Sequence, residues 1–473
     1  MLGEIKGLNE ECGVFALWGH KEAAQLSYYG LHSMQHRGQE GAGIVVSDEE
    51  HLHIHKGLGL VNDAFKEGDL ETLQGHASLG HVRYATAGGG GLDNCQPLMF
   101  RSQTDSLAIA HNGNLVNAHN LKLELEDQGS IFQSTSDTEV IAHLIKRSVY
   151  PRMEDKLSDA LSMVEGAYAL AIMTEDKLLV AQDPHGLRPL SIGKLGGAYV
   201  VASETCAFDV IGAEYEREVQ PGEIITFDQD GMRSELYAKP AERRMCSMEY
   251  VYFSRPDSNI DQINVHTARK NLGKKLAAEA PVEADIVTGV PDSSISAAIG
   301  YAEETGIPYE MGMIKNRYVG RTFIQPSQEL REQGVKMKLS PVRGVVEGKR
   351  VVMVDDSIVR GTTSRRIVTM LKEAGAAEVH VRISSPPITH PCFYGIDTST
   401  KSELIAATHS LEEMREEMGA DSLSFISIDG MLGGIGRQDN DSNCGQCLAC
   451  FTGNYPTDIY EDTLHPHDKV ING

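Results

Sequence analysis

The sequence predicts an α/β protein built from two consecutive domains. Its 473 residues exceed the usual limit for one hydrophobic core, so two cores of roughly 200 to 250 residues each are expected. Up to about residue 235, short apolar runs separated by turn residues indicate strands with a few helices between them. Beyond about residue 260, strands and helices alternate. The first pattern predicts a layered sandwich of antiparallel sheets and helices, and the second predicts a parallel doubly wound sheet.

Each expected element follows from the spacing of apolar residues in a short run. In the first half, we expect strands at 13–18, 78–82, 107–111, 168–174, 178–182 and 198–203, and helices at 22–35 and 137–147. In the second half, we expect strands at 286–290, 351–354 and 379–383, and helices at 268–279 and 295–304. The polar segment 238–244 separates the two patterns and is the best candidate for a linker.

Composition and charge restrict the possible functions. Hydrophobic residues make up 41% of the chain and charged residues 23%, which are values typical of globular proteins. The opening residues lack the apolar core of a signal peptide, and no apolar run is long enough to cross a membrane, so a cytoplasmic location without membrane attachment is expected. A net charge of −24 repels phosphate polymers, and nucleic acid is therefore not an expected partner.

Residues 351–363, with the sequence VVMVDDSIVRGTT, form the most informative segment. Four apolar residues typical of a buried strand lead directly to Asp355 and Asp356. The glycine and threonines at 361–363 precede a helical pattern, so the helix start offers N–H groups to a phosphate. The two acids can bind sugar hydroxyls or a cation shared with a pyrophosphate. The segment predicts a site for a phosphorylated sugar, and the alternative is an ordinary strand-to-helix turn capped by Asp.

The same segment resembles the phosphoribosylpyrophosphate (PRPP) signature of the type I phosphoribosyltransferases. The resemblance implies that the two acids contact the ribose and that the following loop holds its 5-phosphate. The PRPP contacts implied in this segment are Asp355, Asp356, Ser357, Arg360, Gly361, Thr362 and Thr363.

Two further segments fit the same resemblance. Asp292, Ser293 and Ser294 follow an expected strand and would contact pyrophosphate, with the Ser293 hydroxyl joining Asp355 and Asp356 around Mg²⁺. From the residues alone, Ser294 could simply cap the next helix. The basic segment 315–323 resembles the family's mobile flap, and its alternative is a solvated run of surface charge. The flap residues expected to bind PRPP are Arg317, Tyr318 and Arg321.

Four polar clusters in the first half lie next to apolar runs, and Cys12 precedes another such run. The clusters are HRGQEGAG at 36–43, HVRYAT at 81–86, HNGNL at 111–115 and SDTE at 136–139. Together they resemble the N-terminal-nucleophile (type 2) glutamine amidotransferases over nearly all of residues 12–230. The resemblance implies an αββα sandwich with Cys12 as the nucleophile and its own α-amino group as the base. It also implies that residues 1–11 are a propeptide. The alternatives are an inert buried cysteine and a disordered tail.

The resemblance also assigns the groups that would bind glutamine. Arg83 would hold the α-carboxylate of glutamine and Asp137 its α-ammonium group. Asn112 and the backbone N–H of Gly113 would form the oxyanion hole. His36 and His81 are expected to be ordinary core or loop histidines.

Eight cysteines in a chain expected to be cytoplasmic indicate a metal rather than disulfides. Three of them are spaced as Cys444-x2-Cys447-x2-Cys450, and this spacing alone does not separate an iron–sulfur cluster from zinc. Resemblance to propeptide-bearing amidotransferases implies one [4Fe–4S] cluster per subunit with a structural role. Its implied ligands are Cys246, Cys392, Cys447 and Cys450, while Cys444 would be a spectator and Cys95 and Cys206 structural.

The whole chain resembles the glutamine PRPP amidotransferases, a family that begins purine synthesis. The implied reaction takes ammonia from glutamine at Cys12 to C1 of PRPP, with feedback inhibition by AMP, ADP, GMP or GDP and assembly as a homotetramer. The implied parts are a propeptide at 1–11, a glutamine amidotransferase domain at 12–235, a linker at 236–260, a phosphoribosyltransferase domain at 261–440 and a cysteine-containing segment at 441–473.

Three other protein classes share part of these features. A non-catalytic purine-sensing regulator would share the phosphoribosyltransferase fold, but a chain with an intact Cys12 domain argues against it. Another type 2 amidotransferase would lack the segment 351–363, and a salvage phosphoribosyltransferase would not need residues 1–240.

Overall fold

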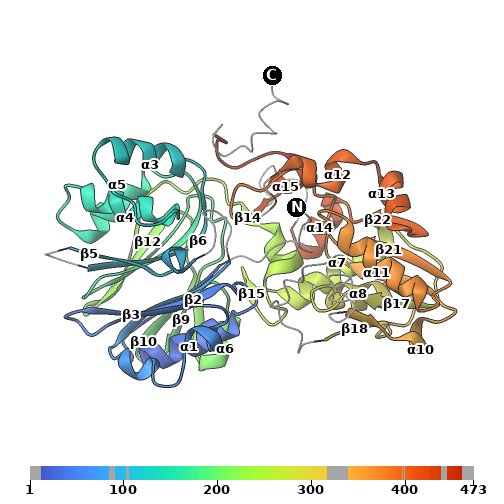
Figure 1. The fold of residues 1–473 in the computed structure, drawn as a ribbon, viewed down its shortest axis with the longest axis horizontal. Helices are drawn as coiled ribbons and strands as arrows, with labels where there is room; N and C mark the ends of the chain where they lie inside the picture. The colour runs from blue at the N-terminus through green and yellow to red at the C-terminus, as the bar shows by residue number, and fades with distance from the viewer. Residues whose placement is uncertain are drawn as a thin grey trace.

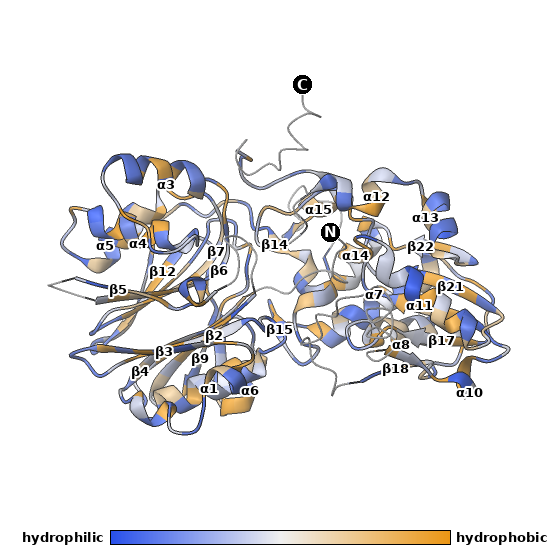
Figure 2. Cartoon of the chain, viewed as in Figure 1, coloured by the Kyte–Doolittle hydropathy of each residue, from blue (hydrophilic) through white to orange (hydrophobic). Residues whose placement is uncertain are grey.

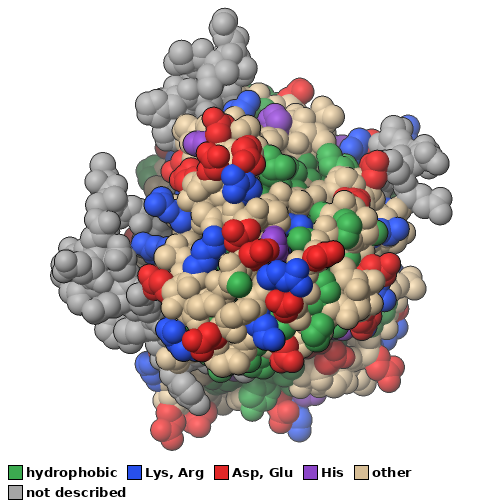
Figure 3. Space-filling model, turned by 90° about the vertical axis from the view of Figure 1, so that its right-hand side faces the viewer, with side chains coloured by type: hydrophobic (Ala, Val, Ile, Leu, Met, Phe, Trp, Pro, Cys, Tyr) green, Lys and Arg blue, Asp and Glu red, His purple; other side chains and the backbone are tan. Residues whose placement is uncertain are grey.

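The computed structural model describes residues 12–84, 91–102, 106–316, 339–396, 398, 400–437 and 445–460. Two stacked sheets lie at the blue-to-green end of the molecule, and a smaller sheet surrounded by helices lies at the yellow-to-red end (Figure 1). Among the described helices, none is both long and apolar enough to span a membrane. Acidic and basic side chains are interspersed over the face of the second half that Figure 3 shows.

The first of the stacked sheets has seven antiparallel strands in the order β11-β9-β10-β1-β4-β2-β3. Helices α1 (Ala23–Ser33) and α6 (Cys206–Ile211) cover its outer face (Figure 1). The short helix α2 (Val61–Ala64) packs near β2 and β3. The strands are β1 (Gly13–Trp18), β2 (Gly41–Ser47), β3 (Leu52–Leu58), β4 (Ala77–Arg83), β9 (Ser191–Leu195), β10 (Ala198–Ala202) and β11 (Glu214–Glu218).

The second stacked sheet has six antiparallel strands in the order β13-β12-β8-β7-β6-β5. Its outer face carries α3 (Ala118–Asp127), α4 (Thr138–Arg147) and α5 (Met153–Leu161) (Figure 1). The strands are β5 (Leu98–Arg101), β6 (Ser106–Leu115), β7 (Gly166–Met173), β8 (Leu178–Gln182), β12 (Glu223–Asp228) and β13 (Gly231–Leu236).

Strand β1 shows why strands of the first half have continuous runs of apolar residues rather than alternating apolar and polar ones. Val14, Ala16 and Trp18 belong to the core between the two sheets, whereas Phe15 and Leu17 belong to the core under α1. Successive side chains of a strand point to opposite faces, so a strand between a sheet and a helix layer must be apolar on both. The αββα layering follows from that requirement.

The second half is built on a parallel sheet with the strand order β17-β20-β21-β22. Two separate cores lie on its two faces, one shared with α7, α8 and α14 and the other with α11 and α13. Figure 2 shows the hydrophilic residues of α13 on the outside of the molecule. The elements are α7 (Val265–Glu279), β17 (Ile286–Gly289), α8 (Ile295–Thr305), β20 (Arg350–Asp355), α11 (Thr362–Glu373), β21 (Glu378–Ile383), α13 (Leu411–Met418), β22 (Ser422–Phe425) and α14 (Ile428–Ile435).

Short elements join or flank the two halves. Strand β14 pairs in parallel with β23, so Cys246 lies opposite Cys447 although the two are far apart in the chain. A π-helix at Glu249–Phe253 follows β14. The remaining short elements are β14 (Met245–Cys246), β15 (Asn259–Ile260), β16 (Ile263–Asn264), β18 (Met313–Lys315), β19 (Leu339–Pro341), α10 (Arg343–Val346), α12 (Ile405–Thr408), β23 (Gln446–Cys447) and α15 (Ala449–Thr452).

Every strand and helix expected from the sequence is present, with bounds that differ by a few residues. The largest difference is in β6, which was expected to end at His111 but continues to Leu115. Asn112 pairs with Ala169 of β7 and Asn114 with Ala167, so polar residues belong to the strand. A strand predicted from the spacing of apolar residues ends before them. This extension places the HNGN residues on a rigid strand.

Candidate active site

A cavity of about 450 Å³ opens beyond the carboxyl ends of β17 and β20. Ligands of parallel sheets bind at this edge. The cavity is lined by nine of the residues expected to bind PRPP, namely Asp292, Ser293, Asp355, Asp356, Ser357, Arg360, Gly361, Thr362 and Thr363. Two loops that are far apart in sequence therefore share one site.

Two adjacent carboxyl groups, those of Asp355 and Asp356, lie at the base of this cavity. The Ser294 hydroxyl donates to Asp355 Oδ1 at 3.0 Å, and the hydroxyls of Ser293 and Ser357 donate to Asp356 at 2.5 and 2.6 Å. Burial raises the pKa of both carboxyls, and the charge of Asp356 raises that of Asp355 further. A buried acidic pair with oxygen donors around it fits a hard divalent cation, which would favour the charged form of both acids.

Ser294 occupies the N-cap position of α8, but its side chain caps nothing. Its hydroxyl reaches Asp355 instead. The Ser294 hydroxyl therefore does not cap α8, which was the alternative that the sequence left open.

The segment expected to bind the 5-phosphate includes Gly361, the N-cap residue of α11. Its φ of +74° favours glycine, and a Cβ there would lie 2.7 Å from Ile405 Cδ1. The first N–H groups of the twelve-residue helix α11 have no partner within the helix and can bind an anion. Arg360, beside them, pairs with Glu403 at 2.5 Å.

Three of the residues expected to bind PRPP, namely Arg317, Tyr318 and Arg321, lie outside the described residues. Lys315, at the start of the expected flap, does line the cavity and pairs with Asp292 at 3.0 Å. The roles of the other three stay predictions.

The expected nucleophile, Cys12, lies at the start of β1. Its Sγ donates to the carbonyl of Tyr84 at 3.6 Å. Because Gly13 pairs with Val82 in the β1–β4 ladder, Cys12 and Arg83 lie at the same end of two adjacent strands. Arg83 is buried and donates to the carbonyl of Gly91 at 3.3 Å.

Asn112 is buried in β6, and its side-chain Nδ2 has no hydrogen-bond partner among the described residues. Leaving a buried donor unpaired costs about 1–3 kcal/mol, so such a group indicates a ligand. Gly113 follows with φ +142°, and a Cβ there would lie 2.0 Å from the carbonyl oxygen of Ala167. Only glycine fits next to this donor.

A contact between the two stacked sheets brings these groups toward each other. His81 of β4 bonds through Nε2 to the carbonyl of His111 at 3.1 Å, one residue before Asn112. Burial lowers the pKa of His81 to about 3, so the imidazole is neutral. Asp137 lies at the start of α4, where its Oδ2 accepts from the N–H of Leu115 at 2.9 Å and lies 3.8 Å from His111 Nδ1. The residues expected to act on glutamine thus come from both sheets and from the start of one helix.

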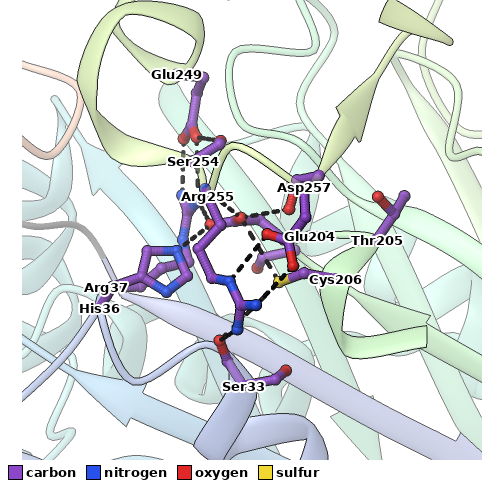
Figure 4. Close-up of polar contacts among 12 residues, drawn as sticks. Ser33, His36, Arg37, Glu204, Thr205, Cys206, Glu249, Ser254, Arg255 and Asp257 are labelled. Atoms are coloured by element: carbon purple, nitrogen blue, oxygen red, sulfur yellow. Dashed lines mark hydrogen bonds and ion pairs between the residues drawn. The ribbon is translucent and has the colours of Figure 1, made fainter. Parts of the chain in front are cut away.

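A buried ionic cluster between the two halves was missed by the sequence reasoning (Figure 4). It contains Arg37, Glu204 and Glu249, whose side chains are inaccessible to solvent. His36 was expected to be an ordinary histidine, but it bonds to Glu204 at 2.7 Å and also lines the cavity that contains Asp355 and Asp356. The available signal was the HRG sequence at 36–38, a charged pair inside an otherwise small-residue motif.

The four cysteines expected to hold a cluster all line one small cavity of about 20 Å³. Among the described residues, no group of His, Cys, Asp or Glu stands in metal-binding geometry. Burial raises the pKa of Cys447 to about 12 and raises that of Cys450 too. Four thiols around one closed, mostly apolar space nevertheless form a donor set that fits an iron–sulfur group, whose charge would stabilise the thiolates. Cys444 lies outside the described residues.

Comparison with known proteins agrees with this geometry. Residues 90–210 match the glutamine amidotransferase domain family, and residues 259–384 match the phosphoribosyl transferase domain family. An amidophosphoribosyltransferase of Bacillus subtilis (strain 168) is 72% identical over 470 residues, which cover 99% of each chain. The chain belongs to the amidophosphoribosyltransferase family. An amidophosphoribosyltransferase of Staphylococcus aureus (strain COL) is 55% identical over 96% of this chain and 92% of that protein.

Solved structures of the amidophosphoribosyltransferase family share the whole fold. One, described as the allosteric regulatory enzyme of purine biosynthesis, is 71% identical, covers 97% of this chain and 99% of its own, and superposes with a TM-score of 0.93. The B. subtilis glutamine PRPP amidotransferase, solved with ADP and GMP, gives 70% identity, 97% and 100% coverage and a TM-score of 0.92. The expected fold class, family and enzyme activity are therefore confirmed: the chain is a glutamine amidotransferase and pentosyltransferase.

Proposed function

We propose that the amidophosphoribosyltransferase reaction of this chain is divided between two half-sites. Glutamine is hydrolysed at Cys12, and the ammonia displaces pyrophosphate from C1 of PRPP to give 5-phosphoribosylamine, the first committed step of purine synthesis. The observation that carries this assignment is the cavity at the carboxyl ends of β17 and β20. Its base carries the acidic pair, and its wall includes His36 from the half that contains Cys12.

In the glutamine half-site, residues 1–11 are removed so that the α-amino group of Cys12 is exposed. This amine takes the thiol proton, and Sγ attacks the amide carbon of glutamine. Asn112 Nδ2, the unpaired buried donor, and the N–H of Gly113 stabilise the oxyanion. The C–N bond then breaks with proton return to nitrogen, ammonia leaves, and water hydrolyses the thioester to glutamate. Arg83 and Asp137 hold the two charged ends of the amino acid.

In the PRPP half-site, ammonia attacks C1 of the ribose as the C1–O bond to pyrophosphate breaks. Asp355, Asp356 and Ser293 would hold Mg²⁺, which supplies positive charge to the departing pyrophosphate. The loop at 361–363 holds the 5-phosphate at the start of α11. Closure of the flap over this site would exclude water and complete an internal path for ammonia. Free competition between added ammonia and glutamine-derived ammonia during turnover would exclude a sealed path.

The residue ranges 1–11, 12–235, 236–260, 261–440 and 441–473 are proposed as the propeptide, glutaminase domain, linker, phosphoribosyltransferase domain and C-terminal segment. A cytoplasmic homotetramer is proposed as the working form. The proposed linker and C-terminal segment contact each other, because β14 pairs with β23. Sedimentation of the purified protein measures its assembly state.

Initial-rate measurements test the proposed function and its regulation together. With glutamine, PRPP and Mg²⁺, the purified protein is expected to release glutamate and pyrophosphate in equal amounts, and intact mass should show a chain beginning at Cys12. We further propose that purine nucleotides such as ADP and GMP inhibit by occupying the PRPP cavity, whose wall includes residues 252–256, or a neighbouring site at a subunit interface. Inhibition competitive with PRPP is the expected result. Pyrophosphate release without glutamate formation would contradict the proposal.

The cysteine cavity is proposed to hold a [4Fe–4S] cluster that ties the linker to the C-terminal segment, with a structural and oxygen-sensitive role. Cys246, Cys392, Cys447 and Cys450 would be its ligands. Anaerobically purified protein is expected to absorb at about 400 nm. Cys450→Ser should lose this absorption and unfold at lower temperature, whereas Cys95→Ser, which changes a buried cysteine away from the cavity, should keep it. Stoichiometric zinc without that absorption would exclude the cluster.

A further inference from the structure

Arg37 connects the expected nucleophile to the buried ionic cluster. Its Nε donates to the backbone carbonyl of Cys12 at 3.2 Å. Its two terminal nitrogens grip Glu249 as a fork, with Nη2 to Oε1 at 2.7 Å and Nη1 to Oε2 at 3.0 Å. Nη1 also donates to Glu204 at 2.6 Å. One guanidinium therefore holds the carbonyl of Cys12 and two carboxylates at once. Figure 4 shows Arg37 beside Glu249 and Glu204.

The two carboxylates come from different parts of the chain. Glu204 follows β10 of the first half, whereas Glu249 opens the π-helix that follows β14. The neighbours of Glu249, Tyr250 and Val251, pack in the same core as α7 and α8 of the second half. The nucleophile's carbonyl is thus held, through Arg37, by a group anchored in the other half of the molecule.

From Glu249 the contacts continue to the PRPP cavity. The Ser254 hydroxyl donates to Glu249 Oε2 at 2.7 Å, and the carbonyl of Ser254 accepts from Arg269 Nη2 at 2.7 Å. Arg269 lines the cavity; burial lowers its pKa to about 10, and the charge of Asp356 opposes that shift. Phe253, Ser254 and Arg269 form part of the cavity wall. A contiguous series of hydrogen bonds therefore joins Cys12 to Arg269 in the wall of the cavity.

The members of this cluster cannot be removed independently. Burial would raise the pKa of Glu204, but His36 and Arg37 hold it below its usual range, so the carboxylate is charged. Arg188 Nη1 lies 3.8 Å from Glu249 as a second cation. Buried ion pairs of this kind contribute little net stability, but loss of one partner leaves the other charge uncompensated. A cluster that is costly to rearrange fixes geometry, and here it fixes the backbone that carries the nucleophile.

We propose that Glu249 is a positioning residue for the Cys12 nucleophile, holding it through Arg37 from the side of the PRPP site. The glutamine half-site is then fully formed only when the segment 249–256 occupies its place beside the PRPP cavity. Displacement of a reacting group by about 1 Å costs on the order of 100-fold in rate, so small shifts of this segment are sufficient. The inference rests on the proposed role of Cys12.

The test compares Glu249→Gln with wild type in two assays of pyrophosphate release, one with glutamine and one with ammonium chloride. The amide keeps the shape of Glu249 but cannot accept both Arg37 donors, so glutamine-dependent kcat/KM is expected to fall about 10- to 100-fold. The ammonium-dependent rate and the KM for PRPP should stay within about twofold of wild type. Neither the attack of ammonia on PRPP nor the binding of PRPP needs Cys12. Glu249→Asp keeps the buried charge, should fold normally, and should show a smaller loss in the same direction.

A second readout follows the nucleophile itself. A diazoketone analogue of glutamine alkylates Cys12, and intact mass gives the rate with and without PRPP. Wild type is expected to react faster with PRPP present, whereas Glu249→Gln should react slowly and equally in both conditions. The matched control is Glu223→Gln, which breaks another Arg–Glu fork, with a buried Glu223 and a partly exposed Arg217 at 2.8 Å to each oxygen, away from either half-site.

The outcomes separate the inference from the proposed function. Equal loss of the glutamine and ammonium rates in Glu249→Gln, no loss at all, or the same selective loss in Glu223→Gln would each overturn the positioning role. Retention of glutamine-dependent activity in Cys12→Ala would overturn the nucleophile assignment instead. If Cys12→Ala loses glutamine-dependent activity but Glu249→Gln keeps it, only the positioning role of Glu249 is overturned.

Discussion

Cys12→Ala is expected to lower glutamine-dependent pyrophosphate release by about 10⁴-fold or more, because the proposed covalent step uses the Cys12 thiolate as its nucleophile. Release driven by ammonium chloride should persist within about twofold, since ammonia enters the PRPP half-site directly. Both rates are measured on the same preparation with saturating PRPP and Mg²⁺.

Cys95→Ala is the matched control for this substitution. Cys95 is a buried cysteine in the same half of the chain, just before β5, and burial raises its pKa to about 11, so it is a poor nucleophile at neutral pH. Both rates of this variant should stay near those of wild type. Equal loss of the ammonium rate in Cys12→Ala would show that the residue supports the fold rather than the glutamine chemistry.

Asp355→Asn and Asp356→Asn are expected to lower both the glutamine-dependent and the ammonium-dependent rates, by about 10²- to 10³-fold, because the departing pyrophosphate loses its charge stabilisation. Alkylation of Cys12 by the glutamine analogue should continue in the absence of PRPP. The rates are measured over a range of Mg²⁺ concentrations, since weakened cation binding predicts a higher Mg²⁺ requirement. Selective loss of the glutamine rate alone would contradict this assignment.

The same substitution that lowers activity at the acidic pair is expected to raise the thermal stability of the ligand-free protein. Burial raises the pKa of both carboxyls in the folded protein, so the folded state binds more protons than the unfolded state between the two pKa values. The stability these groups contribute is present at low pH and is lost as pH rises through the folded pKa. Asp355→Asn, which is neutral at all pH values, should therefore raise the Tm of the ligand-free protein at neutral pH. A lower Tm would indicate that the carboxylate is stabilised by its surroundings.

The fold was predictable because its core strands carry a local signal. Strand β1 was expected at 13–18 and is observed at those residues, since five of its six side chains are apolar. The end of β6 was not predictable, because Asn112 and Asn114 are polar and only their pairing with β7 keeps them in the sheet. A hydrophobic pattern reports burial of side chains and is silent about hydrogen bonds between backbones.

The site was predictable where several functional residues are adjacent in sequence, as at Asp355 and Asp356. It was not predictable where a single residue finds its partner across the fold. Arg37 belongs to a cluster noticed in the sequence, but Glu204 and Glu249 are 167 and 212 residues further on and lie in no motif. Nothing in the periodicity of an isolated glutamate shows which arginine it will meet.

The pairing of β14 with β23 has a consequence for the order in which the chain is completed. Ser247 bonds to the carbonyl of Cys447, 200 residues later in synthesis. At about 5–20 residues per second, β14 emerges from the ribosome roughly 10 to 40 s before its partner strand exists. During that interval the first half can fold, whereas the cysteine cavity, which includes Cys447 and Cys450, cannot be completed. The pairing that ties residues 245–246 to the C-terminal segment is therefore among the last contacts of the nascent chain to form.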